Sequence, residues 1–284
     1  MDYFLDMPLE FSLYENASVV LLPVPYDGTS TFVKGADKGP QAIIDASDSI
    51  ELYDIEEDTE IYLQGIHTAE PVREFSSPEA MADAVYRRVQ RYLKDNKLTG
   101  LLGGEHSVSI GAIRATAEKY PDLTVLQLDA HADLRDEYQG SAYNHACVMR
   151  RAQTFASVVQ VGIRSMCLEE KPNSIAQNLF YAHTVHHSAT WMQDAIDRLG
   201  DTVYLTIDLD CFDPSVLPST GTPLPGGLSW QQVLDFISEV NKHTTIVGFD
   251  VVELCPNPSD KSSDVLAAVL TYKLITKILK KTKQ

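Results

Sequence analysis

Three short segments of the sequence concentrate carboxylate and imidazole side chains at spacings that suit metal binding. They read Gly-Gly-Glu-His-Ser at 103–107, Asp-Ala-His-Ala-Asp at 129–133 and Asp-Leu-Asp-Cys-Phe-Asp-Pro at 208–214. Each follows a run of apolar residues, which predicts that each lies just past a buried strand. In an open parallel sheet, ligands bind outside the carboxyl ends of the strands. The three segments are therefore candidates for one shared site.

The spacing within these segments predicts which side chains meet. In an extended chain, residues two apart point to the same side, so the acidic and imidazole groups of the second segment can converge, as can Asp208 and Asp210. The intervening Ala130, Ala132 and Leu209 suit packing on the opposite face. A further ligand would come from the strand-to-helix turn of the first segment. The candidate metal ligands are His106, Asp129, His131, Asp133, Asp208 and Asp210.

The four aspartates among these candidates indicate how many ions the site needs. Burying four carboxylates without cations would cost several kcal/mol per ion or force their protonation. One divalent ion offsets half of that charge, and two offset all of it. Oxygen-rich ligation with one imidazole per ion favours Mn²⁺ over Zn²⁺, although Fe²⁺, Co²⁺ and Ni²⁺ are not separated by this argument. Two ions about 3.5–4 Å apart can share a water and lower its pKa towards neutrality, which predicts hydroxide attack on an electrophilic carbon.

Some residues of these segments have a simpler interpretation. Asp213, which precedes Pro214, is typical of a turn and is not among the predicted ligands. The Gly103-Gly104 pair alone indicates only that the chain turns tightly after a strand. Core positions rarely hold four carboxylates, so the metal prediction depends on the second and third segments together.

The elements that must position these segments alternate between strand and helix patterns. This alternation is typical of βαβ units and predicts an α/β fold, namely a single domain over 1–284 with three α/β/α layers and a mostly parallel central sheet. Ser229 is a predicted N-cap, and the last helix is predicted to begin at Ser262 or Ser263 and end in Lys280 and Lys281. The expected strands are 18–23, 99–102, 123–129, 157–162, 202–208 and 245–250, and the expected helices are 78–95, 107–119, 188–199, 229–241 and 262–281.

Composition limits the classes of partner. A formal net charge of −17 over 284 residues argues against nucleic acid or an anionic membrane surface as a partner. The first residues lack the features of a secretory signal, and no apolar run is long enough to span a membrane. We therefore expect a cytoplasmic protein whose cysteines are reduced, mostly buried thiols rather than disulfides. The four cysteines are Cys147, Cys167, Cys211 and Cys255.

With these segments, the sequence resembles the ureohydrolase family of arginases and agmatinases almost end to end. The resemblance implies two Mn²⁺ ions per chain. It implies that His106, Asp129, Asp133 and Asp208 hold one ion, and that Asp129, His131, Asp208 and Asp210 hold the other, so that Asp129 and Asp208 bridge them. The commonest form of the first segment has Asp where this chain has Glu105. Since that position is not a ligand in the family, the change bears only on the geometry around the ligands.

The resemblance also implies two catalytic residues. His145, in Tyr-Asn-His-Ala, is similar to a histidine that carries a proton to the departing amine. Glu253 matches a glutamate that binds the guanidinium group, because a carboxylate can accept paired N–H bonds from that planar cation. Taken alone, His145 could be a loop histidine without a task and Glu253 a polar residue at a strand end.

Further segments resemble parts of the family that surround the pocket. The residues 25–30, with Gly39-Pro40 beyond them, look like the loop and helix that complete the pocket rim, and 220–223 resembles a pocket-lining loop. Arg164 has either a structural role or a role in an oligomer contact. The resemblance implies a homo-oligomer, either a trimer or a hexamer.

The implied reaction is hydrolysis of a guanidinium group to urea and an amine by a hydroxide that bridges two Mn²⁺ ions. The stretch 134–145 lacks the Ser-Gly-Asn run of arginases and looks more like agmatinases. Asp136 and Glu137 would suit a substrate tail without a carboxylate, or they are solvated loop charges. The expected partner is thus a small cationic guanidino compound, agmatine, which would give the polyamine putrescine.

The same residues are compatible with other substrates and other functions. Arginine, guanidinobutyrate or another guanidino compound are alternative substrates. A single-zinc deacylase would not need both Asp133 and Asp210. A non-catalytic metal-binding homologue would be expected to have lost ligands, whereas every ligand position here is filled.

Overall fold

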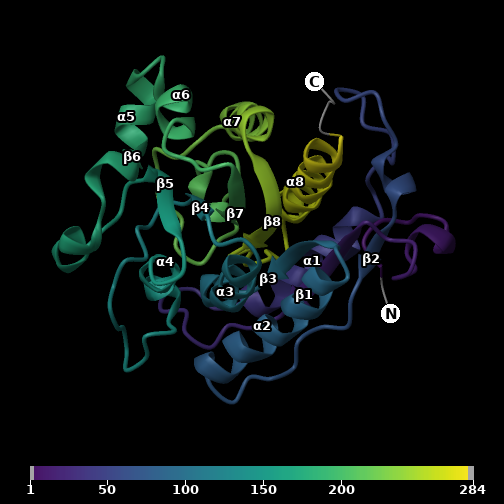
Figure 1. Ribbon diagram of the computed structural model, residues 1–284, viewed down its shortest axis with the longest axis horizontal. Coiled ribbons are helices and arrows are strands. Elements are labelled where there is room, and N and C mark those ends of the chain that lie inside the picture. The colour runs from purple at the N-terminus through teal and green to yellow at the C-terminus, as the bar shows by residue number, and fades with distance from the viewer. Residues whose placement is uncertain (1–2, 281–284) are drawn as a thin grey trace.

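A single sheet of eight parallel strands organises the computed structural model, which describes residues 3–280 (Figure 1). The strands lie in the order β2-β1-β3-β8-β7-β4-β5-β6, and all seven pairings are parallel. Parallel neighbours need long crossover connections, which places helices against the faces of the sheet. The strands are β1 (Val19–Val24), β2 (Ile66–Thr68), β3 (Leu98–Gly103), β4 (Leu123–Leu128), β5 (Ser157–Ile163), β6 (Leu179–Tyr181), β7 (Thr202–Asp208) and β8 (Thr245–Val252).

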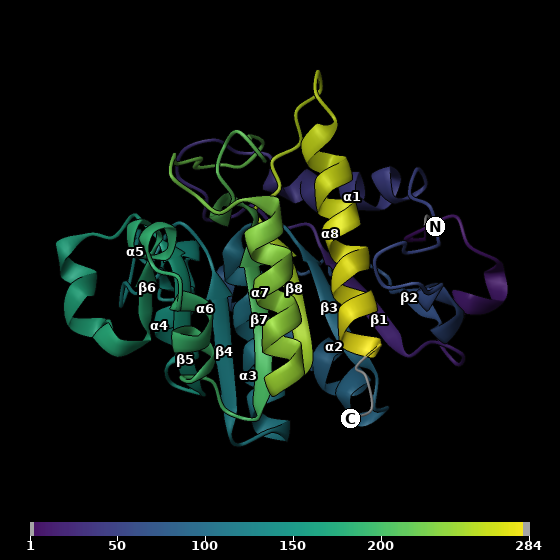
Figure 2. The same cartoon turned by 90° about the horizontal axis from the view of Figure 1, so that it is seen from above.

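Helices cover both faces of this sheet. Residues of α1, α6, α7 and α8 share one apolar core with the strands, and residues of α2, α3 and α4 share a second core. Figure 2 shows α7 and α8 in front of the sheet with α2 and α3 behind it. This arrangement confirms the predicted three-layer α/β fold. The helices are α1 (Gly39–Ser47), α2 (Pro78–Lys94), α3 (Ser109–Lys119), α4 (Val148–Ala152), α5 (Ala182–His187), α6 (Trp191–Ile196), α7 (Trp230–His243) and α8 (Ser262–Leu279).

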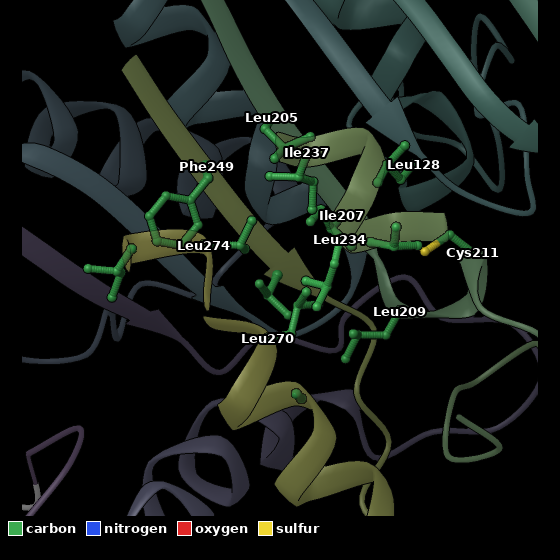
Figure 3. Packing of buried hydrophobic residues seen from close by; sticks show 14 of the residues in the cluster. Leu128, Leu205, Ile207, Leu209, Cys211, Leu234, Ile237, Phe249, Leu270 and Leu274 are labelled. Carbon is green, nitrogen blue, oxygen red and sulfur yellow. The ribbon is translucent and has the colours of Figure 1, made fainter. Parts of the chain in front are cut away.

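Alternate residues of each central strand enter opposite cores. Val19 and Leu21 of β1 pack in the first core, whereas Val20 and Leu22 pack in the second. The strands read as continuous apolar runs because helices cover both faces. Figure 3 shows part of the first core, where side chains of β7, α7 and α8 interlock; among them are Leu205, Ile207, Leu234, Ile237, Leu270 and Leu274.

All six predicted strands form, but one predicted helix is shorter than expected. Within the expected helix 188–199 only α6 forms, and α5, which ends at His187 before residues 188–190, was not predicted. The Ser188 hydroxyl accepts a hydrogen bond from Thr190 N (3.2 Å), and the Thr190 hydroxyl bonds Asp194 (2.9 Å). Such local bonds compete with a continuing helix. The short strands β2 and β6 and the short helix α4 were not predicted, because three to five residues are too few to show a periodic pattern.

The predicted helix ends agree with the structure in part. Ser229 caps α7, since its Oγ accepts from Gln232 N (3.2 Å) and the Gln232 side chain accepts from Ser229 N (3.0 Å). The last helix begins at Ser262 as predicted, but its N-cap is Lys261 without a side-chain cap. Lys280 is its C-cap, while Lys281 lies outside the described residues.

The four cysteines are free thiols, as predicted, but only Cys147 and Cys211 are buried. The other two, Cys167 and Cys255, are half-buried. Cys211 points into the first apolar core (Figure 3). Within residues 3–280, no helix has the length and apolar character needed to cross a membrane.

Ion pairs connect the loop before β2 to α8. Lys273 Nζ bonds Asp54 Oδ1 (2.7 Å) and Glu56 Oε2 (2.8 Å). Asp54 is buried, so removing its partner would leave a carboxylate without a nearby cation. We expect Lys273→Met to lower the free energy of unfolding by about 1–3 kcal/mol near pH 7, measured by chemical denaturation.

The pH dependence of this loss follows from the pKa of Asp54. Burial raises that pKa, but hydrogen bonds from Lys273 and from backbone N–H groups outweigh burial and hold it below its ordinary value. The carboxylate therefore contributes stability above its unfolded pKa of about 3.9 and loses it as the pH falls through the lower folded value. The effect of Lys273→Met should be smaller at pH 3 than at pH 7. Lys242→Met, which removes an exposed pair with Glu239 on α7, is the control and should change stability by less than about 0.5 kcal/mol; equal losses in both variants would contradict the prediction.

Candidate metal centre and active site

The three chemistry-bearing segments follow β3, β4 and β7, and Glu253 follows β8. These four strands are neighbours in the order β3-β8-β7-β4. Because all of them are parallel, their carboxyl ends meet at one edge of the sheet, where ligand sites of such folds lie. The sheet order thus brings together residues that are far apart in the sequence.

One group of ligand atoms surrounds His106. His106, Asp129 and Asp208 each offer a ligand atom, and these atoms lie within 4.8 Å of one another. His106 Nδ1 is 3.1 Å from Asp129 Oδ2, 3.1 Å from Asp133 Oδ2 and 3.4 Å from Asp208 Oδ2. All four residues are buried. The four residues that the resemblance assigned to one ion therefore lie together.

A second group shares Asp129 with the first. Asp129, His131 and Asp210 also offer ligand atoms within 4.8 Å of one another. His131 Nδ1 lies 2.9 Å from Asp210 Oδ2 and 3.6 Å from Asp129 Oδ1. Asp129 thus belongs to both groups, as expected for a bridging ligand, whereas Asp208 belongs only to the first among residues 3–280. The bridging role of Asp208 stays a prediction.

The convergence of these side chains has a different local cause from the one predicted. The alternation of an extended strand was expected, but β4 ends at Leu128 and β7 ends at Asp208. Leu209–Cys211 is a 3-10 turn in which Asp208 Oδ1 accepts from Asp210 N (2.9 Å). Asp133 has a left-handed backbone with φ of 53°. Tight turns, rather than a continued strand, bring the carboxylates together.

The orientation of His106 fits a cation between the carboxylates. Its Nε2 lies 2.9 Å from Thr206 Oγ1, and that hydroxyl donates its proton to Asp250 Oδ1 (2.6 Å). Nε2 must therefore carry the hydrogen, so Nδ1 presents a lone pair. Nδ1 is buried, has no hydrogen-bond partner within residues 3–280 and faces three carboxylate oxygens. A divalent ion would turn this repulsion into coordination, and four carboxylates with two imidazoles suit an Mn²⁺-like ion.

The carboxylates of the cluster repel one another. Burial and the charges of Asp210 and Asp129 raise the pKa of Asp208 well above its ordinary value. Burial and the charge of Asp129 raise the pKa of Asp133 to about 7. A nearby cation favours the ionised form of a carboxylate. The residues present therefore fit the two divalent ions that the sequence predicts.

Glu253 lies beside this cluster in a strained conformation. Its backbone has φ of 67°, and its N–H donates to Gly104 O (2.8 Å). Its Oε1 accepts from His106 N (2.8 Å), which anchors one oxygen of the carboxylate. Burial and the charge of Glu105 raise the pKa of Glu253 well above its ordinary value. Non-glycine residues in the left-handed region occur at ligand-binding positions, where surrounding contacts offset the strain.

His145 contacts the N-terminal loop. Its backbone N donates to Thr29 Oγ1 (2.9 Å), and its Nδ1 lies 3.1 Å from the same oxygen. Burial, which disfavours the charged imidazole, lowers the pKa of His145 to about 4. The imidazole is therefore neutral near pH 7 and can accept a proton before it donates one.

A cavity of about 310 Å³ opens beside these residues. Thr222 lines it, as the resemblance implied for the loop 220–223, and Thr31, directly after the opening loop 25–30, lines it as well. Asp136 does not line it but forms an ion pair with Arg150 (2.6 Å), and Glu137 is exposed, so both are loop charges. Of the eight predicted site residues, the lining includes all but Asp129 and Asp210, namely His106, His131, Asp133, His145, Asp208 and Glu253.

Gln127, which supports the cluster, was not predicted from the sequence, whereas Arg164 and Asp213 have roles that were considered there. Gln127 Nε2 donates to Asp129 Oδ2 (2.6 Å), and the only signal was a polar residue inside an apolar strand. Arg164 Nη2 donates to Asp210 O (2.6 Å) and Leu224 O (2.8 Å), which is a structural role. Asp213 accepts from Ser215, Gly226 and Gly227, as its interpretation as a turn residue predicted.

Comparison with known families decides the class of this site. The Arginase family model matches residues 17–276. The chain belongs to the arginase family. It is 41% identical over 271 residues to an N(1)-aminopropylagmatine ureohydrolase of Thermus thermophilus, covering 92% of this chain and 90% of the relative. It is 32% identical to an agmatinase of Pyrococcus horikoshii, covering 95% of each chain.

A solved structure agrees with this assignment. The agmatine ureohydrolase of Thermoplasma volcanium superposes with a TM-score of 0.88 at 29% identity, covering 99% of this chain and 95% of that one. These similarities confirm the family and the enzyme class predicted from the sequence, an agmatinase-like amidinohydrolase.

Proposed function

We propose that this chain uses two divalent ions, most simply Mn²⁺, to hydrolyse the guanidinium group of a linear cationic substrate to urea and an amine. The observation that carries the proposal is the pair of His/Asp groups joined through Asp129 beside a cavity that Glu253 and His145 line. His106, Asp129, Asp133 and Asp208 would hold one ion, and Asp129, His131, Asp208 and Asp210 the other. When bound, two such ions lower the pKa of a shared water and so supply a nucleophile near neutral pH.

The residues around the ions would orient the substrate and move one proton. One oxygen of Glu253 is anchored by His106 N, so the other is available to the planar guanidinium. A C–O bond forms at the guanidinium carbon, and the bond from that carbon to the alkyl-substituted nitrogen breaks. His145 would accept the proton that the water releases and deliver it to this leaving nitrogen. Urea and the free amine account for all atoms of the substrate and the water.

Two related compounds are candidate substrates for this site. The sequence predicts agmatine, while the 41% identity to an N(1)-aminopropylagmatine ureohydrolase favours the aminopropyl derivative. The cavity suits a cationic tail, because the Glu170 carboxylate lines it and is fixed by bonds from Leu134 N (2.9 Å) and Cys167 N (2.7 Å). We therefore propose an agmatine-type substrate, and of the two we favour N(1)-aminopropylagmatine.

A urea-release assay over a panel of guanidino compounds tests the proposal. The panel contains N(1)-aminopropylagmatine, agmatine, arginine and guanidinobutyrate, each measured as kcat/KM with the Mn²⁺-loaded protein. The first two should be hydrolysed, with the higher kcat/KM for the aminopropyl compound. A preference for a carboxylate-bearing substrate would contradict the choice of tail. A protein that binds two metal ions but hydrolyses no compound would favour the non-catalytic homologue.

Metal removal should abolish activity and weaken the fold. After dialysis against a chelator, we expect urea release to stop, and the temperature of unfolding to fall because the buried carboxylates lose their counter-ions. Adding Mn²⁺ back should restore both. Elemental analysis and thermal denaturation on the same samples measure this. Full activity in a protein shown to be metal-free would overturn the metal assignment.

The proposal includes the assembly predicted from the sequence, a trimer or hexamer in the cytoplasm that binds neither nucleic acid nor membrane. Light scattering coupled to size-exclusion chromatography measures the mass of the assembly directly. A mass equal to one chain of 31.5 kDa would contradict the oligomer.

A further inference from the structure

Glu105 is joined to the His145 ring by hydrogen bonds that no metal-ligand role explains. Its side chain is fully buried and belongs to neither ligand group. Its Oε1 accepts from Thr29 Oγ1 (2.9 Å), Ser107 Oγ (2.8 Å) and Thr29 N (3.3 Å). Its Oε2 accepts from Ser107 N (2.8 Å). Four donors thus converge on this carboxylate, and two of them come from the loop that also contacts His145.

The Thr29 hydroxyl is the link, and its hydrogen-bonding capacity is fully used. A hydroxyl has one hydrogen to donate and two lone pairs to accept with. Its hydrogen goes to the carboxylate of Glu105. One lone pair accepts from His145 N (2.9 Å), which always carries a hydrogen. The remaining lone pair faces His145 Nδ1 at 3.1 Å. The bond to Nδ1 is therefore satisfied only when Nδ1 carries a hydrogen.

We propose that Glu105 and Thr29 are positioning residues that hold His145 in the Nδ1–H tautomer. This inference depends on the proposed function in one respect, the role of His145 as proton carrier. With Nδ1 engaged, Nε2 is the ring nitrogen that exchanges a proton with the cavity that His145 lines. A hydrogen bond to one ring nitrogen determines which of the two nitrogens carries the hydrogen, and proteins commonly fix a histidine tautomer in this way.

The identity of residue 105 matters for this link. Glu105 also caps the 3-10 turn at His106–Val108 through its bond to Ser107 N. An aspartate makes such a capping bond readily, but its side chain is one methylene shorter. The extra methylene of Glu105 allows one carboxylate to bond Ser107 on its own turn and Thr29 on the N-terminal loop. This gives a physical role to the position where the chain departs from the common form of its first segment.

The direct test is the tautomer of His145, measured by ¹⁵N NMR of histidine-labelled protein. Diamagnetic Zn²⁺ replaces Mn²⁺ in these samples, and comparison with His145→Asn assigns the signals. Wild type and Thr29→Ser, which keeps the hydroxyl, should both carry the hydrogen on Nδ1. Thr29→Val, which keeps the shape but removes the hydroxyl, should show a mixture of tautomers. A hydrogen on Nε2 in wild type would overturn the inference.

Glu105→Gln gives a second, opposite prediction. The bond from Ser107 N (2.8 Å) is much shorter than the bond from Thr29 N (3.3 Å), so the amide oxygen takes the Oε2 position and the amide nitrogen faces Thr29 Oγ1. That nitrogen donates, which frees the Thr29 hydrogen to point at His145 Nδ1. The tautomer should therefore change from Nδ1–H to Nε2–H. An unchanged tautomer in both Thr29→Val and Glu105→Gln would overturn the inference.

Kinetics separate positioning from a general structural role. We expect kcat of Thr29→Val to fall by about tenfold or more, since general acid–base catalysis contributes about 10²–10⁴ and only its alignment is lost. KM and the two bound metal ions per chain should be unchanged, and Thr29→Ser should restore kcat. Parallel losses of metal and kcat would overturn the positioning role. Because the NMR result needs no turnover, a correct tautomer in a protein that hydrolyses nothing would refute the proposed function and leave the inference standing.

Discussion

Asp129→Asn is expected to remove both metal ions and to lower the rate of urea release by about a thousandfold or more. Asp129 is fully buried and is the one residue shared by both ligand groups among residues 3–280. Its two oxygens face different imidazoles, with Oδ2 3.1 Å from His106 Nδ1 and Oδ1 3.6 Å from His131 Nδ1. An amide offers one neutral oxygen and a donor nitrogen in place of two anionic oxygens. Metal ions supply several kcal/mol of transition-state stabilisation, and about 1.4 kcal/mol corresponds to tenfold in rate.

The measurement pairs elemental analysis with the urea assay on the same samples. Asp136→Asn is the matched control, because Asp136 lies outside the cavity and pairs with Arg150 at the surface. The control should retain two ions and full activity. If Asp129→Asn still bound two ions and hydrolysed substrate, neither the ligand assignment nor the proposed mechanism would stand.

Glu253→Gln is expected to lower kcat/KM by about a hundredfold or more while both metal ions stay bound. The carboxylate lines the cavity with one oxygen fixed by His106 N, so a guanidinium would meet a pre-oriented acceptor. An amide in its place loses the charge and turns a donor toward a substrate that only donates. Leaving one member of a buried charge pair without its partner costs about 2–5 kcal/mol, which is roughly 30-fold to several thousandfold in rate.

The urea assay combined with metal analysis distinguishes Glu253→Gln from Asp129→Asn. Glu137→Gln is the control, since Glu137 is exposed and does not line the cavity. The loss in Glu253→Gln should be similar for the hydrolysed substrates of the panel, because the missing interaction is with the guanidinium group that they share. Loss of metal together with activity would instead assign Glu253 to the metal centre.

Much of the site could be predicted because carboxylate and imidazole side chains bind metal ions wherever the fold gathers them. His106, His131 and the four aspartates are polar residues at the ends of apolar runs, and charge alone indicates that they need cations. The strands were predictable for a related reason, since burial on both faces requires uninterrupted apolar residues. The helix predicted at 188–199 begins only at Trp191, because hydrogen bonds at Ser188 and Thr190 hold the preceding residues in a non-helical turn.

Thus the sequence by itself determined the three-layer α/β fold, the family and the candidate ligands, which depend on residue type and short-range spacing. Only the tertiary structure decided how those ligands are held, through the 3-10 turn at Leu209–Cys211 and the left-handed backbone of Asp133. Only the tertiary structure also joined Thr29 to Glu105, 76 residues away, and to His145, 116 residues away. Hydrogen bonds between distant segments leave no periodic trace in the sequence, because they depend on where the sheet brings each loop.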